Sequence, residues 1–337
     1  MTVTTPAQPA EPDVAQPDGQ SDGQRHAGPS LSPSRAADFK TCPLLFRFRT
    51  IDRLPETPSP DQLRGTLVHA VLERLFDLPP AERTPAAAAE LVAPEWQRLV
   101  TAEPALTTLF TPAAAGPAAL DPVIADALPT GPAVETPMLD GMPLDEPGRL
   151  AAFFESTRGL LQGYFAVEDP MRLEPAEREA LVSTLVDEQL LIRGYIDRLD
   201  VSPAGDLRVV DYKTGGAPRE AFEGRALFQL KFYALVLWRT RGVVPRVLRL
   251  LYLRDQEICD YSPDAEELER FERTLVALSE AIERAKREKH FPPKPSRLCG
   301  WCSHQAFCPE FGGTPPPFPE RAPDPDPSPE DLLDADA

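Results

Sequence analysis

Residues 194–200 read Gly-Tyr-Ile-Asp-Arg-Leu-Asp, and residues 209–215 read Val-Val-Asp-Tyr-Lys-Thr-Gly. Both runs are apolar and typical of strands, yet an aspartate interrupts each of them, Asp197 in the first and Asp211 in the second. Because side chains alternate across a strand, Asp211 and Lys213 share one face. Two carboxylates can hold a hard divalent cation, and a lysine beside them can orient a water or help to deprotonate it. The set predicts metal-assisted attack on a phosphodiester, with a surface hairpin held by a salt bridge as the alternative.

The segments around these runs predict further strands. Residues 179–186 and 190–201 are expected to form an antiparallel pair that turns at 187–189. A second turn, at residues 203–206 (Pro-Ala-Gly-Asp), precedes the strand that carries Asp211.

A helix is predicted over residues 62–77, where apolar residues recur at i, i+3, i+4 and i+7. His69 lies at the margin of that apolar face, and Glu73, one turn further on, is positioned to hydrogen-bond its ring. A single histidine at a helix margin is more often a half-buried residue than a ligand. Its role therefore depends on what else the sequence shows.

Two polar residues lie within a helix that is otherwise apolar. The helix predicted over residues 222–241 is apolar nearly all round, so Gln229 and Tyr233, four residues apart within it, need polar partners. Backbone groups can serve as those partners. Arg198 is a weak candidate for contact with a phosphate, because it can instead pair with Asp200 on the outer surface.

Five cysteines in a chain of this size do not indicate a disulfide framework. Cys299 and Cys302 alone would suit a zinc knuckle or a redox pair. With Cys308 and the distant Cys42 they make four soft ligands, which suit Zn²⁺ and an iron–sulfur cluster alike. Cys259 lies outside this pattern and is predicted to be a buried free thiol.

Taken in order, these elements resemble a known family, the RecB-type branch of the PD-(D/E)XK nucleases. This branch includes the nuclease domains of recombination helicase-nucleases and the CRISPR-associated iron–sulfur nucleases. The matching elements, apart from the two aspartate strands, are Leu-Leu-Phe-Arg at 44–47 after Cys42, Gly-Thr-Leu-Val-His at 65–69, Gln-x-x-x-Tyr at 229–233, and the cysteines at 299–308. The resemblance spans residues 31–311 apart from an insert.

The resemblance implies an α/β, restriction-endonuclease-like fold, with a mixed central sheet flanked by helices and a cysteine-ligated cluster joining the N- and C-terminal parts. It implies Mg²⁺ or Mn²⁺ held by His69, Asp197, Asp211 and the backbone carbonyl of Tyr212. Lys213 would position the attacking water, with Asp197 and Asp211 as its catalytic partners. Gln229 and Tyr233 would bind substrate. It further favours a [4Fe-4S] cluster, with Zn²⁺ as the alternative, on Cys42, Cys299, Cys302 and Cys308.

Composition divides the chain of 337 residues into a body, an insert and two tails. The 41 prolines are concentrated outside the body. We predict disordered tails at residues 1–30 and 312–337 and a nuclease domain over 31–311. An Ala/Pro-rich acidic insert occupies 77–150 and begins with a helix over 86–99 anchored by Trp96.

The acidity of the chain is unevenly distributed. Of the formal net charge of −18, residues 1–36 carry −2, residues 77–150 carry −8 and residues 309–337 carry −7. Residues 201–250, by contrast, hold nine bases and four acids. The segment around the predicted site is therefore basic enough to meet phosphates.

The sequence contains no apolar run of 18 residues and no signal-peptide pattern, which predicts a cytoplasmic protein without a membrane span. It also lacks a Gly-x4-Gly-Lys-Ser/Thr loop, so we expect no ATP site and, for duplex substrates, a helicase supplied in trans.

With the resemblance, these features predict a divalent-metal-dependent deoxyribonuclease. The favoured activity is an exonuclease on single-stranded DNA, in repair or recombination. The alternative is a non-catalytic nuclease-like module that binds DNA ends or scaffolds a helicase, although the intact charged set argues against it. Processing of spacers in CRISPR adaptation, which uses the same chemistry, is less favoured.

Overall fold

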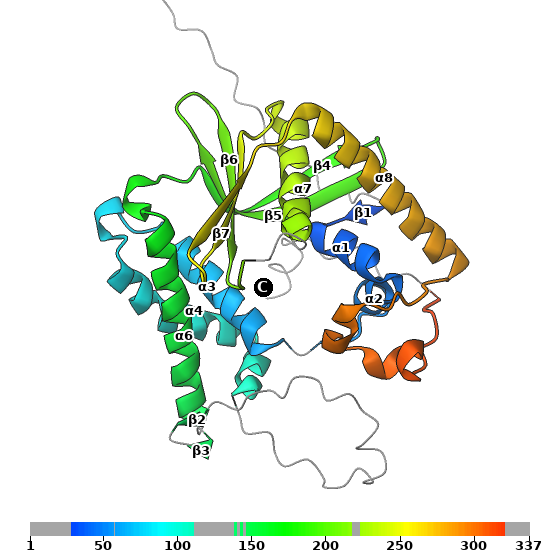
Figure 1. Ribbon diagram of the computed structural model, residues 1–337, viewed down its shortest axis with the longest axis horizontal. Helices are drawn as coiled ribbons and strands as arrows, with labels where there is room; N and C mark the ends of the chain where they lie inside the picture. Colours follow the sequence, from blue (N-terminus) through cyan, green and yellow to red (C-terminus); the bar gives the residue numbers. More distant parts are fainter. Residues whose placement is uncertain are drawn as a thin grey trace, which may run out of the picture.

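The computed structural model describes residues 28–56, 58–110, 138–139, 142–143, 146–217 and 223–320. These residues form a mixed six-stranded sheet with helices on both faces, which confirms the predicted α/β arrangement of sheet and helices (Figure 1). A separate two-stranded pair, β2 (Met138–Leu139) and β3 (Met142–Pro143), stands apart from this sheet. No helix in the described part of the chain is both long and apolar enough to cross a bilayer.

Strand β5 pairs with three other strands: β4 along one edge, and β1 and β6 at opposite ends of the other edge. β4 runs antiparallel along one edge, as the predicted hairpin requires. On the other edge β1 pairs in parallel with the start of β5, and β6 pairs antiparallel with its end. β7 then lies parallel to β6, and β8 antiparallel to β7. The strands are β1 (Ser30–Leu31), β4 (Glu177–Val186), β5 (Leu190–Val201), β6 (Leu207–Lys213), β7 (Val247–Tyr252) and β8 (Glu257–Tyr261).

Helices cover the two faces of the sheet as two groups (Figure 1). The first group is α1 (Pro33–Thr41), α2 (Pro43–Phe46), the π-helical turn η1 (Arg47–Ile51), α7 (Glu223–Arg241) and α8 (Ala265–Glu288). The second is α3 (Pro60–Leu75), α4 (Pro85–Ala102) and α6 (Glu146–Val167). Short 3₁₀ turns complete the chain: η2 (Pro80–Glu82), η3 (Pro104–Leu109), η4 (Pro170–Arg172), η6 (Arg297–Trp301), η7 (Gln305–Phe307) and η8 (Pro309–Phe311).

Each helical group encloses its own apolar core against the sheet, and β6 contributes to both. Val209 is buried in the core under α7 and α8, whereas Val210 and Tyr212 are buried in the core under α3, α4 and α6. This is the alternation expected of a strand buried on both faces. It places Asp211 and Lys213 on one face of β6, as predicted from the sequence, and this face is the one that α7 covers.

The start of the acidic insert is part of the second core. Its predicted helix corresponds to α4, and Trp96 packs edge-on against Phe110 and Phe153. The rest of the insert up to α6 lies largely outside the described residues, as do residues 1–27 and 321–337 of the predicted tails.

The first part of the segment predicted as a C-terminal tail, 312–337, does not behave as a tail. Phe318 stacks on Phe291 with ring centroids 6.0 Å apart, and the Arg47 guanidinium lies 5.3 Å from the Phe318 ring. Arg47 also donates a hydrogen bond to the carbonyl of Pro316. The Pro-rich composition predicts disorder, but the Phe318 ring packs against the Phe291 ring and the Arg47 guanidinium.

Candidate active site

His69 is placed by α3, which begins with a capping box between Ser59 and Gln62. The neighbouring apolar residues of α3 are buried, and the imidazole, 28% exposed, projects toward the ends of β5 and β6. Its Nε2 lies 3.0 Å from the Tyr212 carbonyl oxygen, and its Nδ1 lies 3.5 Å from Asp197 Oδ2. The ring is therefore oriented by the sheet, and not by Glu73 as the sequence suggested.

Asp211 and Lys213 begin a chain of polar contacts that runs from β6 to α7. Lys213 Nζ lies 2.6 Å from Asp211 Oδ2 and donates to Gln229 Oε1 at 3.0 Å. Gln229 Nε2 in turn donates to the hydroxyl of Tyr233 at 2.9 Å. The polar groups of Gln229 and Tyr233 thus have hydrogen-bond partners in each other and in Lys213. Through Gln229, α7 holds the Lys213 ammonium in place.

Gly194, the first residue of the opening sequence run, allows α7 to lie close to β5. A Cβ at this position would be 2.7 Å from Cε1 of Tyr233, which is shorter than real contacts of this kind. The glycine therefore makes room for the Tyr233 ring, and the ring supports the Gln229–Lys213 contact.

Glu179 is a site residue that the sequence reasoning missed. It lies opposite Asp197, between the ladder pairs Arg178–Arg198 and Ala180–Ile196, and its φ of 43° is unusual for a non-glycine residue. Its Oε1 is 3.7 Å from His69 Nδ1. The turn predicted at 187–189 fixes which residues of the two strands lie opposite each other and places Glu179 opposite Asp197. The sequence therefore contains the signal that identifies Glu179.

The alternation of β5 is interrupted at the same place. Ile196 and Leu199, three residues apart, are buried in the same core, which a regular strand does not allow. The irregularity lies at Asp197 and faces the strained Glu179. This irregularity leaves the carboxylates of Asp197 and Glu179 beside the imidazole of His69. The arrangement of the site therefore depends on a local departure from regular strand geometry.

The pKa values of His69 and Asp197 indicate an accumulation of carboxylate charge around the imidazole. Burial, and next the carboxylate of Asp211, raise the pKa of Asp197 to about 7. Burial disfavours the charged imidazolium, but the carboxylates of Asp197, Glu179 and Asp211 outweigh it and raise the pKa of His69 to about 9. Tyr212 N–H donates to Asp197 Oδ2 at 2.8 Å and favours its charged form.

The donor set fits a divalent cation. Ligand atoms of His69, Glu179 and Asp197 lie within 4.8 Å of one another. The clustered carboxylates draw protons to the site, and a bound cation would replace those protons.

Arg198 does not contact phosphate, because it is fully buried. Its guanidinium forms two hydrogen bonds with Glu168, the residue after the end of α6, at 2.6 and 2.8 Å, and donates to the hydroxyl of Tyr212 at 3.0 Å. Asp200 Oδ1 lies 3.1 Å from Nε. The predicted pairing with Asp200 therefore exists, but inside the protein, where it ties β5 to β6 and α6.

The family of the chain follows from the match over this part of the sequence. The model of the PD-(D/E)XK nuclease superfamily matches residues 30–309. This chain belongs to that superfamily. PD-(D/E)XK nucleases use divalent metal ions, in keeping with the carboxylate and histidine group described above.

Other comparisons are more distant, and no curated protein matches the chain. A solved structure from Eubacterium rectale described as a "Putative exonuclease" has a TM-score of 0.46 and 12% identity, covering 95% of this chain and 98% of that one. The structure of SSO0001 has a TM-score of 0.32 and 20% identity, covering 48% and 71%. The assignment to the PD-(D/E)XK superfamily therefore depends on the family match.

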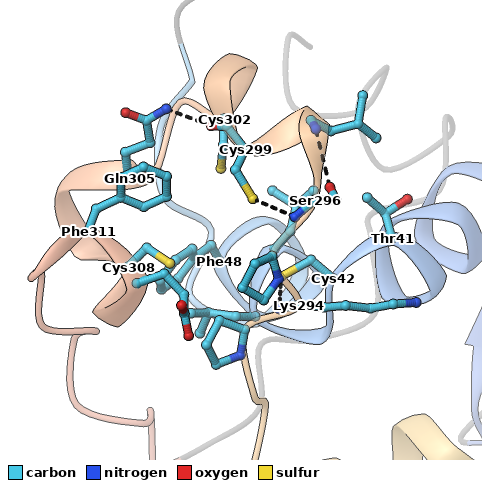
Figure 2. Close-up of a pocket in the computed structure, with 16 residues that line it drawn as sticks. Thr41, Cys42, Phe48, Lys294, Ser296, Cys299, Cys302, Gln305, Cys308 and Phe311 are labelled. Atoms are coloured by element: carbon cyan, nitrogen blue, oxygen red, sulfur yellow. Dashed lines mark hydrogen bonds between the residues drawn. The ribbon is translucent and has the colours of Figure 1, made fainter. Parts of the chain in front are cut away.

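The four cysteines that the sequence grouped together line one cavity of this PD-(D/E)XK protein (Figure 2). Cys42 follows α1, Cys299 lies in η6, and Cys302 and Cys308 directly follow η6 and η7. The backbone N–H of Lys294 donates to Cys42 Sγ at 3.4 Å, and that of Ser296 donates to Cys299 Sγ at 3.2 Å. Cys259 lies apart from them in β8. His304, between the cysteines, is buried and 2.6 Å from Glu56.

Proposed function

We propose that this PD-(D/E)XK protein is a metal-dependent deoxyribonuclease of the RecB type, an exonuclease on single-stranded DNA in repair or recombination. The observation that carries the proposal is the meeting of His69, Glu179 and Asp197 next to the Asp211–Lys213 pair. Residues from α3, β4, β5 and β6 contribute, so the group is a product of the fold and not of local sequence. A module that only binds DNA would not need this arrangement.

In this proposal His69, Asp197, Asp211 and the Tyr212 carbonyl hold Mg²⁺ or Mn²⁺, with Glu179 as a further carboxylate. The metal supplies Lewis-acid polarisation of the phosphate and a water of lowered pKa. Lys213, held by Gln229, orients the attacking water and stabilises the negative charge that develops on the phosphate.

The test is degradation of end-labelled single- and double-stranded DNA with Mg²⁺, Mn²⁺ or EDTA. We expect metal-dependent loss of single strands from their ends. Asp211→Ala and Lys213→Ala should each lower the rate by about 100-fold or more while leaving DNA binding and the circular dichroism spectrum unchanged. Arg172→Ala, an exposed charge change outside the site, is the control. Wild-type rates in either site variant would refute the proposed site, and DNA binding without cleavage by the wild type would favour the non-catalytic module.

We further propose that Cys42, Cys299, Cys302 and Cys308 hold a [4Fe-4S] cluster. All four cysteines line one cavity, and a [4Fe-4S] cluster takes one cysteine thiolate on each of its four irons. Zn²⁺ on the same four ligands is the alternative.

Anaerobic purification tests the cluster. The protein should be brown and contain iron and sulfide, and Cys42→Ala should lose both together with part of its thermal stability. Cys259→Ala, which lies outside the group, should retain both. One zinc per colourless chain would refute the iron–sulfur assignment and would leave the role of the cysteines in joining the two ends.

A further inference from the structure

A second cavity, of about 350 Å³, lies beside the cysteines, between α1, the first turns of α7 and the segment before η6. Lys40, Phe228, Lys294 and Leu298 are the side chains that define it. No carboxylate lines this cavity in the described part of the chain. It is therefore a basic surface on a chain whose overall charge is strongly negative.

The two lysines of this cavity lack the acidic partners that other lysines have. Lys294 Nζ donates to the backbone carbonyl of Lys40 at 2.9 Å, and Lys40 Nζ lies 4.1 Å from the centre of the Phe228 ring. Among the described residues neither ammonium has a carboxylate within 4.0 Å, whereas Lys231 and Lys286 have theirs at 2.6 and 2.7 Å. Burial and the neighbouring Lys294 charge lower the pKa of Lys40. Lys40 and Lys294 are therefore two positive charges that no carboxylate of the described residues balances within 4.0 Å.

Apolar side chains continue this surface along η6. Leu298 and Trp301 are three residues apart on a 3₁₀ turn, where side chains at i and i+3 lie on the same side. Leu298 is 37% exposed, and Trp301, at 73%, is the most exposed large apolar side chain of the described residues. Together with Leu298, which lines the cavity, Trp301 offers exposed apolar surface next to the basic cavity.

We propose that this basic and aromatic surface binds single-stranded DNA next to the active site. The ammonium groups of Lys40 and Lys294 contact successive phosphates, and Trp301 stacks on a base. Protein-binding patches are depleted of lysine at their centres, which argues for a polyanion and against a protein partner. The inference rests on the proposed nuclease function and adds to it a path for the substrate.

The position of the surface on α7 supports this path. Phe228 lines the cavity, and the next residue, Gln229, projects about 100° further round α7 and contacts Lys213. A strand bound at Lys40 and Lys294 therefore needs only to pass the N-terminal turns of α7 to reach the catalytic group. The cysteine-bearing segment would thus have a second role, because it presents Lys294 and Trp301 to that strand.

Binding of a fluorescein-labelled oligodeoxythymidylate in EDTA tests the proposal by anisotropy. Trp301→Ala should raise Kd about 10-fold, and Trp301→Phe, which keeps an aromatic ring, should stay within about 3-fold of the wild type. The double variant Lys40→Ala/Lys294→Ala should reduce the slope of log Kd against log salt by about 1.4, for two lost phosphate contacts. The control, Lys286→Ala, removes a lysine that is paired with Glu283, and its slope should stay near that of the wild type.

Cleavage distinguishes failure of this inference from failure of the proposed function. If the surface binds substrate, KM for single strands should rise in the Trp301 and lysine variants while kcat at saturating DNA is unchanged. Wild-type Kd, salt slope and KM in these variants would overturn the inference and leave the nuclease proposal intact. A wild-type protein that binds single strands without cleaving them would refute the nuclease proposal, and the binding assay would still report on the surface.

Discussion

Replacing Asp197 by asparagine should make the metal-free protein more stable and remove its response to Mg²⁺. The difference between the ordinary carboxyl pKa of 3.8 and the value of about 7 corresponds to roughly 4 kcal/mol against the charged form. The side chain is only 9% exposed, and asparagine can still accept the Tyr212 N–H, so we expect a gain on the order of 2–4 kcal/mol at pH 8.

The sign of this effect sets its pH dependence. Since the folded protein binds this proton more tightly than the unfolded chain, the penalty is absent below about pH 4, grows between pH 4 and 7, and is constant above that. The advantage of Asp197→Asn at pH 5 should therefore be less than half of its value at pH 8. Removing one carboxylate should also weaken metal binding, because fewer charged ligands remain.

Urea unfolding in EDTA and thermal unfolding with and without Mg²⁺ measure both effects. Asp206→Asn is the matched control, because this aspartate is exposed and forms a surface pair with Arg246 at 3.0 Å, so its loss should change stability by less than about 1 kcal/mol. The reasoning fails if Asp197→Asn is no more stable than the wild type in EDTA at pH 8. It also fails if Mg²⁺ raises the melting temperature of the variant as much as that of the wild type.

Metal affinity, measured by calorimetry, should rise steadily between pH 6 and 9, because the protons held by the buried carboxylate and imidazole compete with the cation; a flat profile would contradict the ligand set. Gly163→Ala should cost more than about 2 kcal/mol in urea unfolding, since a Cβ there would overlap the backbone of Leu253, and a stability within error of the wild type would refute the close packing. Deleting residues 321–337 should leave the melting temperature unchanged, whereas deleting 312–337 should lower it through loss of the stacked Phe318; equal melting temperatures would show that this ring contributes nothing.

Much of the fold could be predicted because it depends on the pattern of apolar and turn residues within short segments. The hairpin of β4 and β5, the strand β6 and the helices α3 and α7 follow from periodicity and turn residues, and the shared face of Asp211 and Lys213 follows from alternation alone. These features need no knowledge of distant contacts.

The misses all depend on distant partners. Local sequence predicts a surface position for Arg198, because its partner Glu168 lies 30 residues away and outside the strand. Glu179 is a polar residue in a half-exposed strand and looks ordinary until the opposite strand is aligned with it. Composition predicts a disordered tail around Phe318, because it does not reveal the contact of this ring with Phe291.

The contact between Cys42 and Lys294 spans 252 residues, which has a consequence for biosynthesis. At about 5–20 residues per second, the ribosome needs roughly 13–50 s after making the first partner before it makes the second. During that interval the residues from His69 to Tyr233 have all been translated, while Cys42 and α1 have no C-terminal partner. The nascent chain can thus assemble its catalytic group before its two ends are joined. The cysteine cavity can therefore close only after residues 294–308 have been made, so its assembly is one of the last steps in the folding of this chain.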